Sequence, residues 1–171
     1  MKCPACQHDN IPGVDQCANC MSDLTAVAEA ALDPVERSFN EVRMRELIKR
    51  SPLKVAPTDS VESVVHRMAS QSRPCALVVY DDVVVGIFTE RDALGRISAD
   101  YDGTRDKPVR EFMTAAPETL SANVCLAYAV NKMSVGGYRH VPITDIDEKP
   151  LGVVAVRDVV ERLFQAMPES A

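Results

Sequence analysis

The sequence contains one short motif twice, and this internal repeat restricts the chain to folds that can be built from two similar units. The first copy, Gly-Ile-Phe-Thr-Glu-Arg-Asp, runs from Gly86 to Asp92, and the second, Gly-Val-Val-Ala-Val-Arg-Asp, runs from Gly152 to Asp158. Each copy follows apolar, β-branched residues and precedes a helix-like segment. The hydroxyl and carboxylate three residues apart in the first copy can cap their own helix, or they can present oxygens and backbone N–H groups to a ligand.

The similarity extends well beyond the motif. Apolar residues with the i, i+3, i+4, i+7 spacing of one helical face precede both copies: Val61, Val64, Val65 and Met68 in the first, and Leu126, Ala129, Val130 and Met133 in the second. Strand-like segments follow at 76–80 and 141–144. Apolar residues of a further helix come after each motif: Ala93, Leu94 and Ile97, then Val159, Val160, Leu163 and Phe164.

Each unit is therefore predicted to run strand–helix–strand–strand–helix, in an α/β fold of the α+β type. Neither unit is long enough to bury a generous core alone, because small domains bury a smaller fraction of their surface. We expect the two units to pack together with approximate two-fold symmetry.

This arrangement resembles a tandem pair of CBS domains, often called a Bateman module, over roughly residues 51 to 165. The first copy fits that family's Gly-hydrophobic-x-Thr/Ser-x-x-Asp signature. Residues 109–114 look like the usual lead into the second repeat, and residues 138–143 look like the family's basic, hydrophobic and proline-containing strand entry.

A second signal lies at the start of the chain, where two C-x-x-C pairs supply four thiols: Cys3, Cys6, Cys17 and Cys20. Two such pairs can hold one tetrahedral, structural Zn²⁺, and metal binding would contribute on the order of 10–16 kcal/mol to folding of this polar segment. A disulfide pair or a redox-active C-x-x-C fits less well, because no leader sequence or βαβ context is apparent. The segment resembles a short zinc ribbon, although Gln7 and Met21 stand where such ribbons usually have Gly. His8 is interpreted as a loop residue.

Composition narrows the possible partners. The formal net charge is −6, and from residue 1 to 36 Lys2 is the only basic side chain besides His8, against six acidic ones. Nucleic-acid binding, which depends on neutralising phosphates, is therefore disfavoured. No apolar run of about 20 residues is present, so no membrane span is expected. Free thiols, including the isolated Cys75 and Cys125 in apolar settings, favour a reducing cytoplasm.

A linker rich in alanine, residues 25–32, separates the cysteines from the repeats. Asp33-Pro34-Val35-Glu36 then has the signature of a helix start, and that helix is predicted to continue to Ser51-Pro52 and to pack on the repeats or on a second copy. The predicted divisions are a ribbon at 1–24, linker and helix at 25–50, the first repeat at 51–107 and the second at 108–171.

The CBS resemblance implies an adenosine-nucleotide site between the repeats. In that family the Asp of the motif holds ribose hydroxyls and the Thr contacts the sugar–phosphate, while basic residues of the other repeat meet the phosphates, in keeping with the hydrogen-bonding capacity of these groups. Carried over, the site residues are Thr89 and Asp92, with Gly86 for close backbone approach, Ala56 beside the base, and Arg139, His140 and Arg157 from the second repeat. Each also has a plain structural interpretation, as a helix cap or as a solvated or hydrogen-bonded side chain.

A second site around Asp158 is expected to be weak or vacant. Ala155 replaces the threonine there, and Pro74 and Cys75 match Arg139 and His140, which leaves Arg91 and Arg73 as phosphate partners.

No catalytic constellation is visible, so we expect no enzyme. The leading hypothesis is a cytoplasmic regulator, homodimeric as CBS pairs typically are, that binds AMP, ADP or ATP and signals to a protein partner. The alternative is a structural adaptor with an unliganded CBS core whose ribbon contacts a protein, and a nucleic-acid-binding ribbon ranks last.

Overall fold

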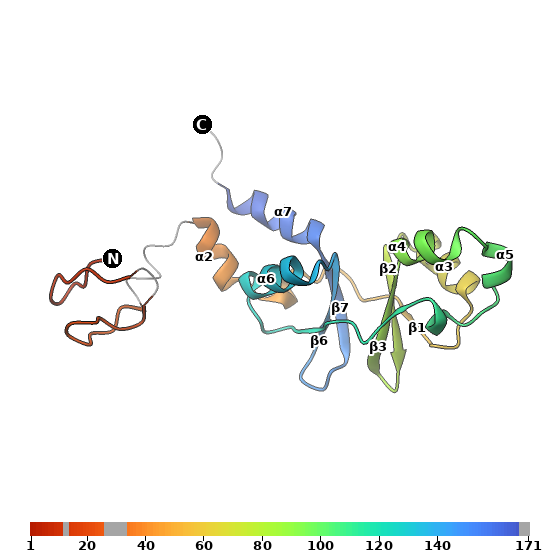
Figure 1. Cartoon of the computed structure of the whole chain (residues 1–171), viewed down its shortest axis with the longest axis horizontal. Helices are drawn as coiled ribbons and strands as arrows, with labels where there is room; N and C mark the ends of the chain where they lie inside the picture. The colour runs from red at the N-terminus through yellow and green to blue at the C-terminus, as the bar shows by residue number, and fades with distance from the viewer. Residues whose placement is uncertain (12–13, 26–33, 168–171) are drawn as a thin grey trace.

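A computed structural model of the 171-residue chain describes residues 1–11, 14–25 and 34–167, and it places two α/β units side by side (Figure 1). No helix in these described ranges is both long and apolar enough to cross a membrane. The alanine-rich linker and the predicted N-cap at Asp33 lie outside the described residues.

The first unit is a four-stranded sheet with its helices on one side. The sheet has the order β1-β2-β3-β4, with β1 (Lys54–Val55) parallel to β2, and with β3 antiparallel to both β2 and β4. The other elements are β2 (Cys75–Tyr80), β3 (Val83–Thr89), β4 (Thr114–Ala115), helices α3 (Val61–Ser70), α4 (Glu90–Asp92) and α5 (Tyr101–Thr104), the π-helical turn η2 (Ala93–Ile97) and the 3₁₀ turn η3 (Val109–Glu111).

The second unit repeats this order with three strands, β5 parallel to β6 and β6 antiparallel to β7. Its elements are β5 (Leu120–Ser121), α6 (Leu126–Gly136), β6 (His140–Thr144), β7 (Pro150–Ala155) and α7 (Val156–Ala166). The predicted strand–helix–strand–strand–helix order and the α/β fold class are thereby confirmed.

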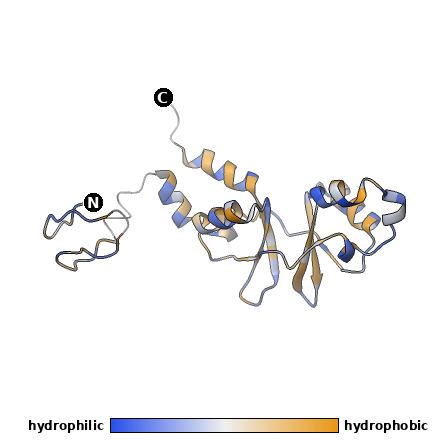
Figure 2. Cartoon of the chain, viewed as in Figure 1, coloured by the Kyte–Doolittle hydropathy of each residue, from blue (hydrophilic) through white to orange (hydrophobic). Residues whose placement is uncertain are grey.

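The predicted apolar stripes form the cores of the two units. Val61, Val64 and Met68 of α3 are buried, as are Leu126, Ala129 and Met133 of α6. Figure 2 shows the matching hydrophobic colouring of the strands on which these helices pack. Strand β2 is buried on both faces along most of its length. Its sequence is therefore a continuous run of apolar residues and does not alternate between apolar and polar residues.

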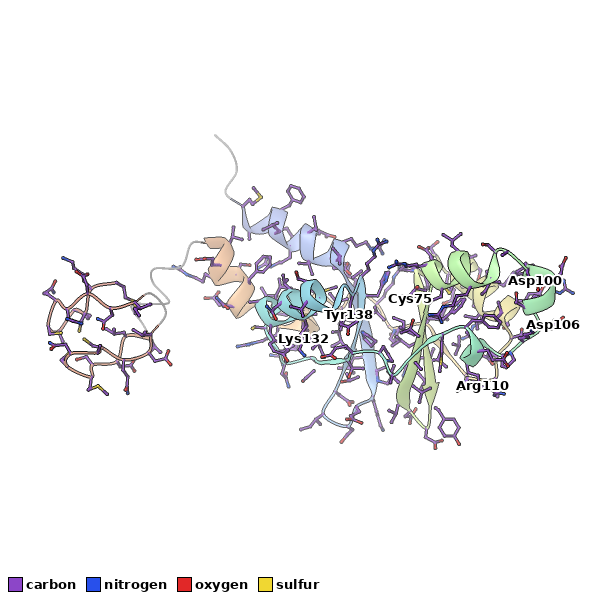
Figure 3. The ribbon with its side chains drawn as sticks, in the orientation of Figure 1. Cys75, Asp100, Asp106, Arg110, Lys132 and Tyr138 are labelled. Atoms are coloured by element: carbon purple, nitrogen blue, oxygen red, sulfur yellow. The ribbon has the colours of Figure 1, made fainter. Side chains whose placement is uncertain are left out.

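The sheets of the two units meet in the middle of the molecule. Leu77 and Ile87 form a small apolar cluster with Cys75 on the face of the first sheet that points away from α3, and Val153 of β7 packs against that cluster. Figure 3 shows Cys75 at this junction. Burial raises the pKa of the Cys75 thiol to about 12, so it behaves as a small apolar side chain, as expected.

Two expectations about helices were wrong. The helix that was predicted to continue to Ser51-Pro52 is α2 (Pro34–Glu41), which ends at Glu41. The separate 3₁₀ turn η1 (Met44–Leu47) follows it. Leu94, placed on the apolar face of the helix after the first motif, is 73% exposed. The π-helical turn that begins after Asp92 changes the helical phase at this point and carries Leu94 away from the core.

Helix α2 packs on the second unit although it precedes the first in sequence. It contacts α6 and α7, and buried Val42, Met44 and Leu47 join the core of the second unit. Of the two packing partners left open by the sequence, the repeats or a second copy, the structure shows the repeats.

The glycine at the start of each motif leaves room for a side chain from the segment that precedes the other repeat. A Cβ on Gly86 would overlap the side chain of Met113, and a Cβ on Gly152 would lie 2.6 Å from Cγ2 of Ile48. The two contacts occupy matching positions, so the segments around Ile48 and Met113 are structurally equivalent.

Replacing Gly86 with Ala is expected to lower the free energy of unfolding by about 1–3 kcal/mol, because the new methyl group overpacks against Met113. Gly95→Ala is the matched control: it lies in a helical turn with open space around it, and the change should raise stability by up to about 1 kcal/mol. Urea unfolding of both variants checks this, and equal effects would contradict the assigned contact.

Candidate functional site between the repeats

Thr89 and Asp92 close the N-terminus of the helix that begins at Glu90. The backbone N–H and the hydroxyl of Thr89 donate to Oδ2 of Asp92 at 3.0 and 2.7 Å, and the backbone N–H of Asp92 donates to the Thr89 hydroxyl at 3.3 Å. Nε of Arg96 lies 3.5 Å from Oδ1 of Asp92. This reciprocal cap fixes the carboxylate, which is 9% exposed, in one orientation.

The capped turn forms one wall of a cleft of about 970 Å³, and the second unit forms the opposite wall. Residues of the first unit that line it include Thr89, Asp92 and Thr114, and those of the second include Arg139 and His140. The sequence-predicted carboxylate, hydroxyl and basic pair are therefore brought together across the junction. A volume near the upper end of the range for small-molecule sites is ample for a nucleotide.

The cleft carries more cationic than acidic groups. Arg91, Arg96 and Arg139 line it together with Glu90 and Asp92. Burial lowers the pKa of His140 and Glu90 opposes that shift, so the imidazole is mainly neutral at pH 7 and presents one N–H donor and one acceptor. Tyr138, which sequence reasoning did not select, adds an aromatic ring at the second-unit wall (Figure 3).

Three residues of the expected set stand apart from this cleft. Arg157 lines a different cavity, beside Asp158. Ala56 is exposed beyond the end of β1, where its N–H donates to Oδ2 of Asp59 at 3.0 Å, and it lines neither cavity. The space above Gly86 is taken by Met113, so this glycine serves packing within the first unit.

Asp158 has the same capping geometry as Asp92 but a different neighbour. Its Oδ2 accepts the backbone N–H of Ala155 at 2.8 Å, and its Oδ1 lies 3.1 Å from Nζ of Lys49. Lys49 also lies 2.5 Å from Oε2 of Glu161. The next residue after Ile48 is Lys49, and the next residue after Met113 is Thr114, so Lys49 and Thr114 occupy equivalent positions. Lys49 therefore lies beside Asp158 where Thr114 lies beside the Asp92 cleft.

The cavity beside Asp158 is small, at about 170 Å³. The expected basic partner Arg73 lines it, whereas Arg91 lines the Asp92 cleft instead. Sequence reasoning missed Lys49 and Arg50, which reach this cavity from the segment before the first repeat. The alignment of Lys49 with Thr114 is the signal that could have found the lysine.

At the N-terminus the four cysteine sulfurs converge, and all of them lie within 4.8 Å of one another. The Sγ atoms of Cys3 and Cys20, and those of Cys6 and Cys17, are 3.6 Å apart. A tetrahedron of sulfurs around Zn²⁺ has edges of about 3.8 Å, given Zn–S bonds near 2.3 Å, so the residues fit this ion. Nδ2 of buried Asn10 lies 3.5 Å from the Cys17 sulfur, where it would orient that sulfur toward a bound metal.

The two cysteine turns are built alike. The N–H of Gln7 donates to the carbonyl of Cys3 at 2.8 Å, and the N–H of Met21 donates to that of Cys17 at 2.9 Å. Gln7 and Met21 have φ values of 62° and 59°, in the left-handed region that favours glycine. Gln7 and Met21, which stand where zinc ribbons usually have Gly, are therefore strained in both turns.

Met21→Gly is expected to stabilise the cysteine segment by up to about 1 kcal/mol, because Gly tolerates a left-handed φ and Met21 is 65% exposed. Asn19→Gly is the control, since Asn19 has no positive φ and glycine there only adds chain entropy. A zinc competition titration should show tighter metal retention in the first variant and weaker retention in the second. The opposite order would contradict the strain argument.

The comparisons with known proteins agree with this geometry. The CBS domain family matches residues 44–99 and 109–165. The chain belongs to the CBS-domain family. A curated relative, the CBS domain-containing protein CBSCBSPB1 of Arabidopsis thaliana, is 37% identical over 108 residues, which are 63% of this chain and 19% of the relative. The chain thus matches about one fifth of the length of such plant relatives.

Solved CBS structures share the fold. An uncharacterised conserved protein from Pyrococcus horikoshii is 26% identical, with a TM-score of 0.65 over 77% of this chain and 98% of that one. A CBS domain protein from Pyrobaculum aerophilum, complexed with AMP, is 23% identical, with a TM-score of 0.64 over 73% and 98% of the two chains. The inosine-5'-monophosphate dehydrogenase of Methanocaldococcus jannaschii is 28% identical over 118 residues, which are only 23% of that enzyme. CBS-domain proteins are generally regulatory rather than catalytic.

Proposed function

We propose that this chain is a regulatory CBS protein of the cytoplasm that binds an adenosine nucleotide, AMP, ADP or ATP, in the Asp92 cleft and signals to a protein partner. The observation that carries the proposal is the meeting of Asp92 and Thr89 from one unit with Arg139 and His140 from the other in a cleft of about 970 Å³. A carboxylate accepts hydrogen bonds from ribose hydroxyls, and guanidinium groups bind phosphate oxygens. The AMP complex of the Pyrobaculum relative supports this ligand class.

Binding would be transmitted because the cleft lies between two units. A ligand that contacts both walls favours the arrangement in which those walls are correctly spaced, and it shifts the population toward that arrangement. Helix α2 packs on the second unit and connects it to the N-terminal cysteine segment, so it is the element that would carry the change to a partner.

The test is a calorimetric titration of the zinc-loaded chain with AMP, ADP and ATP. We expect saturable binding of one nucleotide per chain, because Lys49 already neutralises Asp158 and the cavity there is small. An absence of heat with all three nucleotides, in a protein that melts cooperatively, would favour the adaptor, an unliganded CBS core whose ribbon contacts a protein. One observation favours that alternative: both Asp92 oxygens already have partners within the chain.

We further propose that the chain forms a homodimer through the helices that follow the two motifs. Leu94 and Val160 stand at equivalent positions, two residues after Asp92 and Asp158, and both are exposed. Phe164, one turn further along α7, is 70% exposed. An apolar surface contributed equally by both repeats suits an isologous interface.

Phe164→Glu is expected to convert the dimer to a monomer, because a charge buried without a partner in the interface is costly. Ile146→Glu is the matched control, since Ile146 is 95% exposed in the turn between β6 and β7. Sedimentation equilibrium should give twice the 18.7 kDa chain mass for wild type and control, and the single mass for Phe164→Glu. A monomeric wild type, or a dimeric Phe164→Glu variant, would contradict this interface.

For the N-terminal segment we propose a structural Zn²⁺ held by Cys3, Cys6, Cys17 and Cys20, which would tie together a segment with a minimal apolar core. The acidic balance of residues 1–36 supports a protein-contacting ribbon over a nucleic-acid-binding one.

A further inference from the structure

The four cysteine sulfurs that we assign to Zn²⁺ differ in their access to solvent. Cys3 and Cys17, the first cysteine of each C-x-x-C pair, are 0% exposed. Cys6 is half-buried, and Cys20 is exposed. The cluster is therefore closed around Cys3 and Cys17 and open to solvent at Cys20.

Buried Asn10 covers the closed side of the cluster. Its Oδ1 accepts the backbone N–H of Ala18 at 2.9 Å, and its Nδ2 donates to the carbonyl of His8 at 3.0 Å. The same Nδ2 lies 3.5 Å from the Cys17 sulfur. Asn10 thereby joins the two cysteine turns beside Cys17 and helps to keep that sulfur away from solvent.

Cys20 combines the two properties that make a cysteine reactive towards oxidants. A thiol that coordinates a metal is deprotonated, and oxidation follows thiolate character and solvent exposure. The sulfur of Cys3 lies 3.6 Å from that of Cys20, so a second thiolate stands next to the exposed one. An exposed thiolate beside a resolving thiolate is the arrangement found in redox-sensing cysteines.

We propose that Cys20 is a modification site at which hydrogen peroxide opens the cysteine cluster, with Cys3 as the resolving thiolate. The inference rests on the structural zinc site proposed above. It goes beyond that site because it gives the N-terminal segment a response to oxidants.

The modification takes two balanced steps. The Cys20 thiolate attacks one oxygen of hydrogen peroxide, so that an S–O bond forms, the O–O bond breaks and hydroxide leaves. The sulfur is thereby oxidised to a sulfenic acid, and the peroxide is reduced. The Cys3 thiolate then attacks the Cys20 sulfur, so that an S–S bond forms, the S–O bond breaks and a second hydroxide leaves.

The disulfide leaves Cys6 and Cys17 as the remaining thiolates of the cluster. Two sulfurs are too few for the closed, four-coordinate site of a structural zinc ion. Because the apolar cluster of this segment is small, loss of the metal is expected to unfold the segment and to leave the CBS pair folded. Thiols of a reducing compartment reverse the disulfide by thiol–disulfide exchange.

The experiment treats the intact, zinc-loaded chain with hydrogen peroxide and follows zinc release with a chromophoric chelator. Dimedone, which traps sulfenic acids, marks the first sulfur that is oxidised, and mass spectrometry of peptides locates the adduct and the disulfide. We expect release of one zinc per chain, a first adduct on Cys20 and a disulfide between Cys3 and Cys20.

Cys20→His separates exposure of the thiolate from metal binding, because three cysteines and one histidine also form a structural zinc site. We expect this variant to hold one zinc and to release it at least about tenfold more slowly in peroxide, because the exposed thiolate is gone. Cys17→His is the matched control, since it makes the same ligand change at a buried sulfur and should release zinc at the wild-type rate. Cys6→His, which also keeps Cys3 and Cys20, takes its place if Cys17→His does not hold zinc.

Three results would overturn the proposal: zinc that is retained in peroxide-treated wild type, equal release rates in Cys20→His and wild type, or a first dimedone adduct on another cysteine of the cluster. A wild-type chain that holds no zinc before treatment would instead overturn the structural zinc site, and this inference with it.

Discussion

Cys17→Ser is expected to unfold the N-terminal cysteine segment and to leave the CBS pair folded. Among the described residues of this segment the apolar cluster is small: Cys3, Cys17 and Leu24 are buried, and Met1, Cys6 and Val14 pack around them. Such a core is insufficient for a segment of this length, and a structural Zn²⁺ would supply on the order of 10–16 kcal/mol. Losing one of four thiolates removes much of that contribution.

The measurement is zinc content by mass spectrometry together with the backbone amide NMR spectrum. Wild type should hold one zinc per chain with dispersed signals from residues 1–24, and a strong chelator should collapse those signals alone. Cys125→Ser is the matched control, because Cys125 is half-buried outside the cluster and its loss should leave zinc content at one. A dispersed ribbon spectrum without metal would contradict a structural role for zinc.

Asp92→Ala is expected to weaken nucleotide binding by about 100-fold. Hydrogen bonds from two ribose hydroxyls to a charged carboxylate are worth about 1.5–3 kcal/mol each, and a loss of about 3 kcal/mol corresponds to that factor. The same change removes the cap that Asp92 forms with Thr89, so the free energy of unfolding should fall by about 1–2 kcal/mol. Affinity must therefore be measured by calorimetry well below the melting temperature.

Asp158→Ala is the control that separates the two effects. Asp158 caps α7 through the N–H of Ala155 as Asp92 caps its own helix, so this change should cost similar stability. Its carboxylate faces Lys49 rather than the large cleft, so nucleotide affinity should stay within about twofold of wild type. Equal losses of affinity in both variants would mean that the effect comes through folding or that nucleotide occupies both sites.

The sequence predicted the paired units well because their signals are local. The helical spacing of Val61, Val64 and Met68 requires one face to be buried, and the structure buries it. The Thr89–Asp92 spacing is typical of a capped turn at the end of a strand, one of the two interpretations that the sequence left open, and that turn forms. Arg139 and His140 reach the same cleft because β6 begins at the junction between the units.

The features that sequence reasoning missed depend on contacts between distant segments. Lys49 meets Asp158 only because the chain before the first repeat packs on the second, and a pattern that extended α2 to Ser51 placed this lysine in a helix. The exposure of Leu94 follows from the π-helical turn after Asp92, which an i, i+3, i+4 pattern does not reveal. Arg157 and Arg91 occupy equivalent motif positions, and only the packing of the units shows which cavity each one lines.

The most direct test of the nucleotide site is an AMP titration of ¹⁵N-labelled protein followed through its backbone amide signals. The proposed site predicts saturable shifts in residues 89–97 and 137–140, on the two walls of the Asp92 cleft, with much smaller shifts at Lys49 and at 155–158. Shifts centred on Lys49 and Asp158, or no saturable shifts at all, would contradict the assignment of nucleotide binding to Asp92.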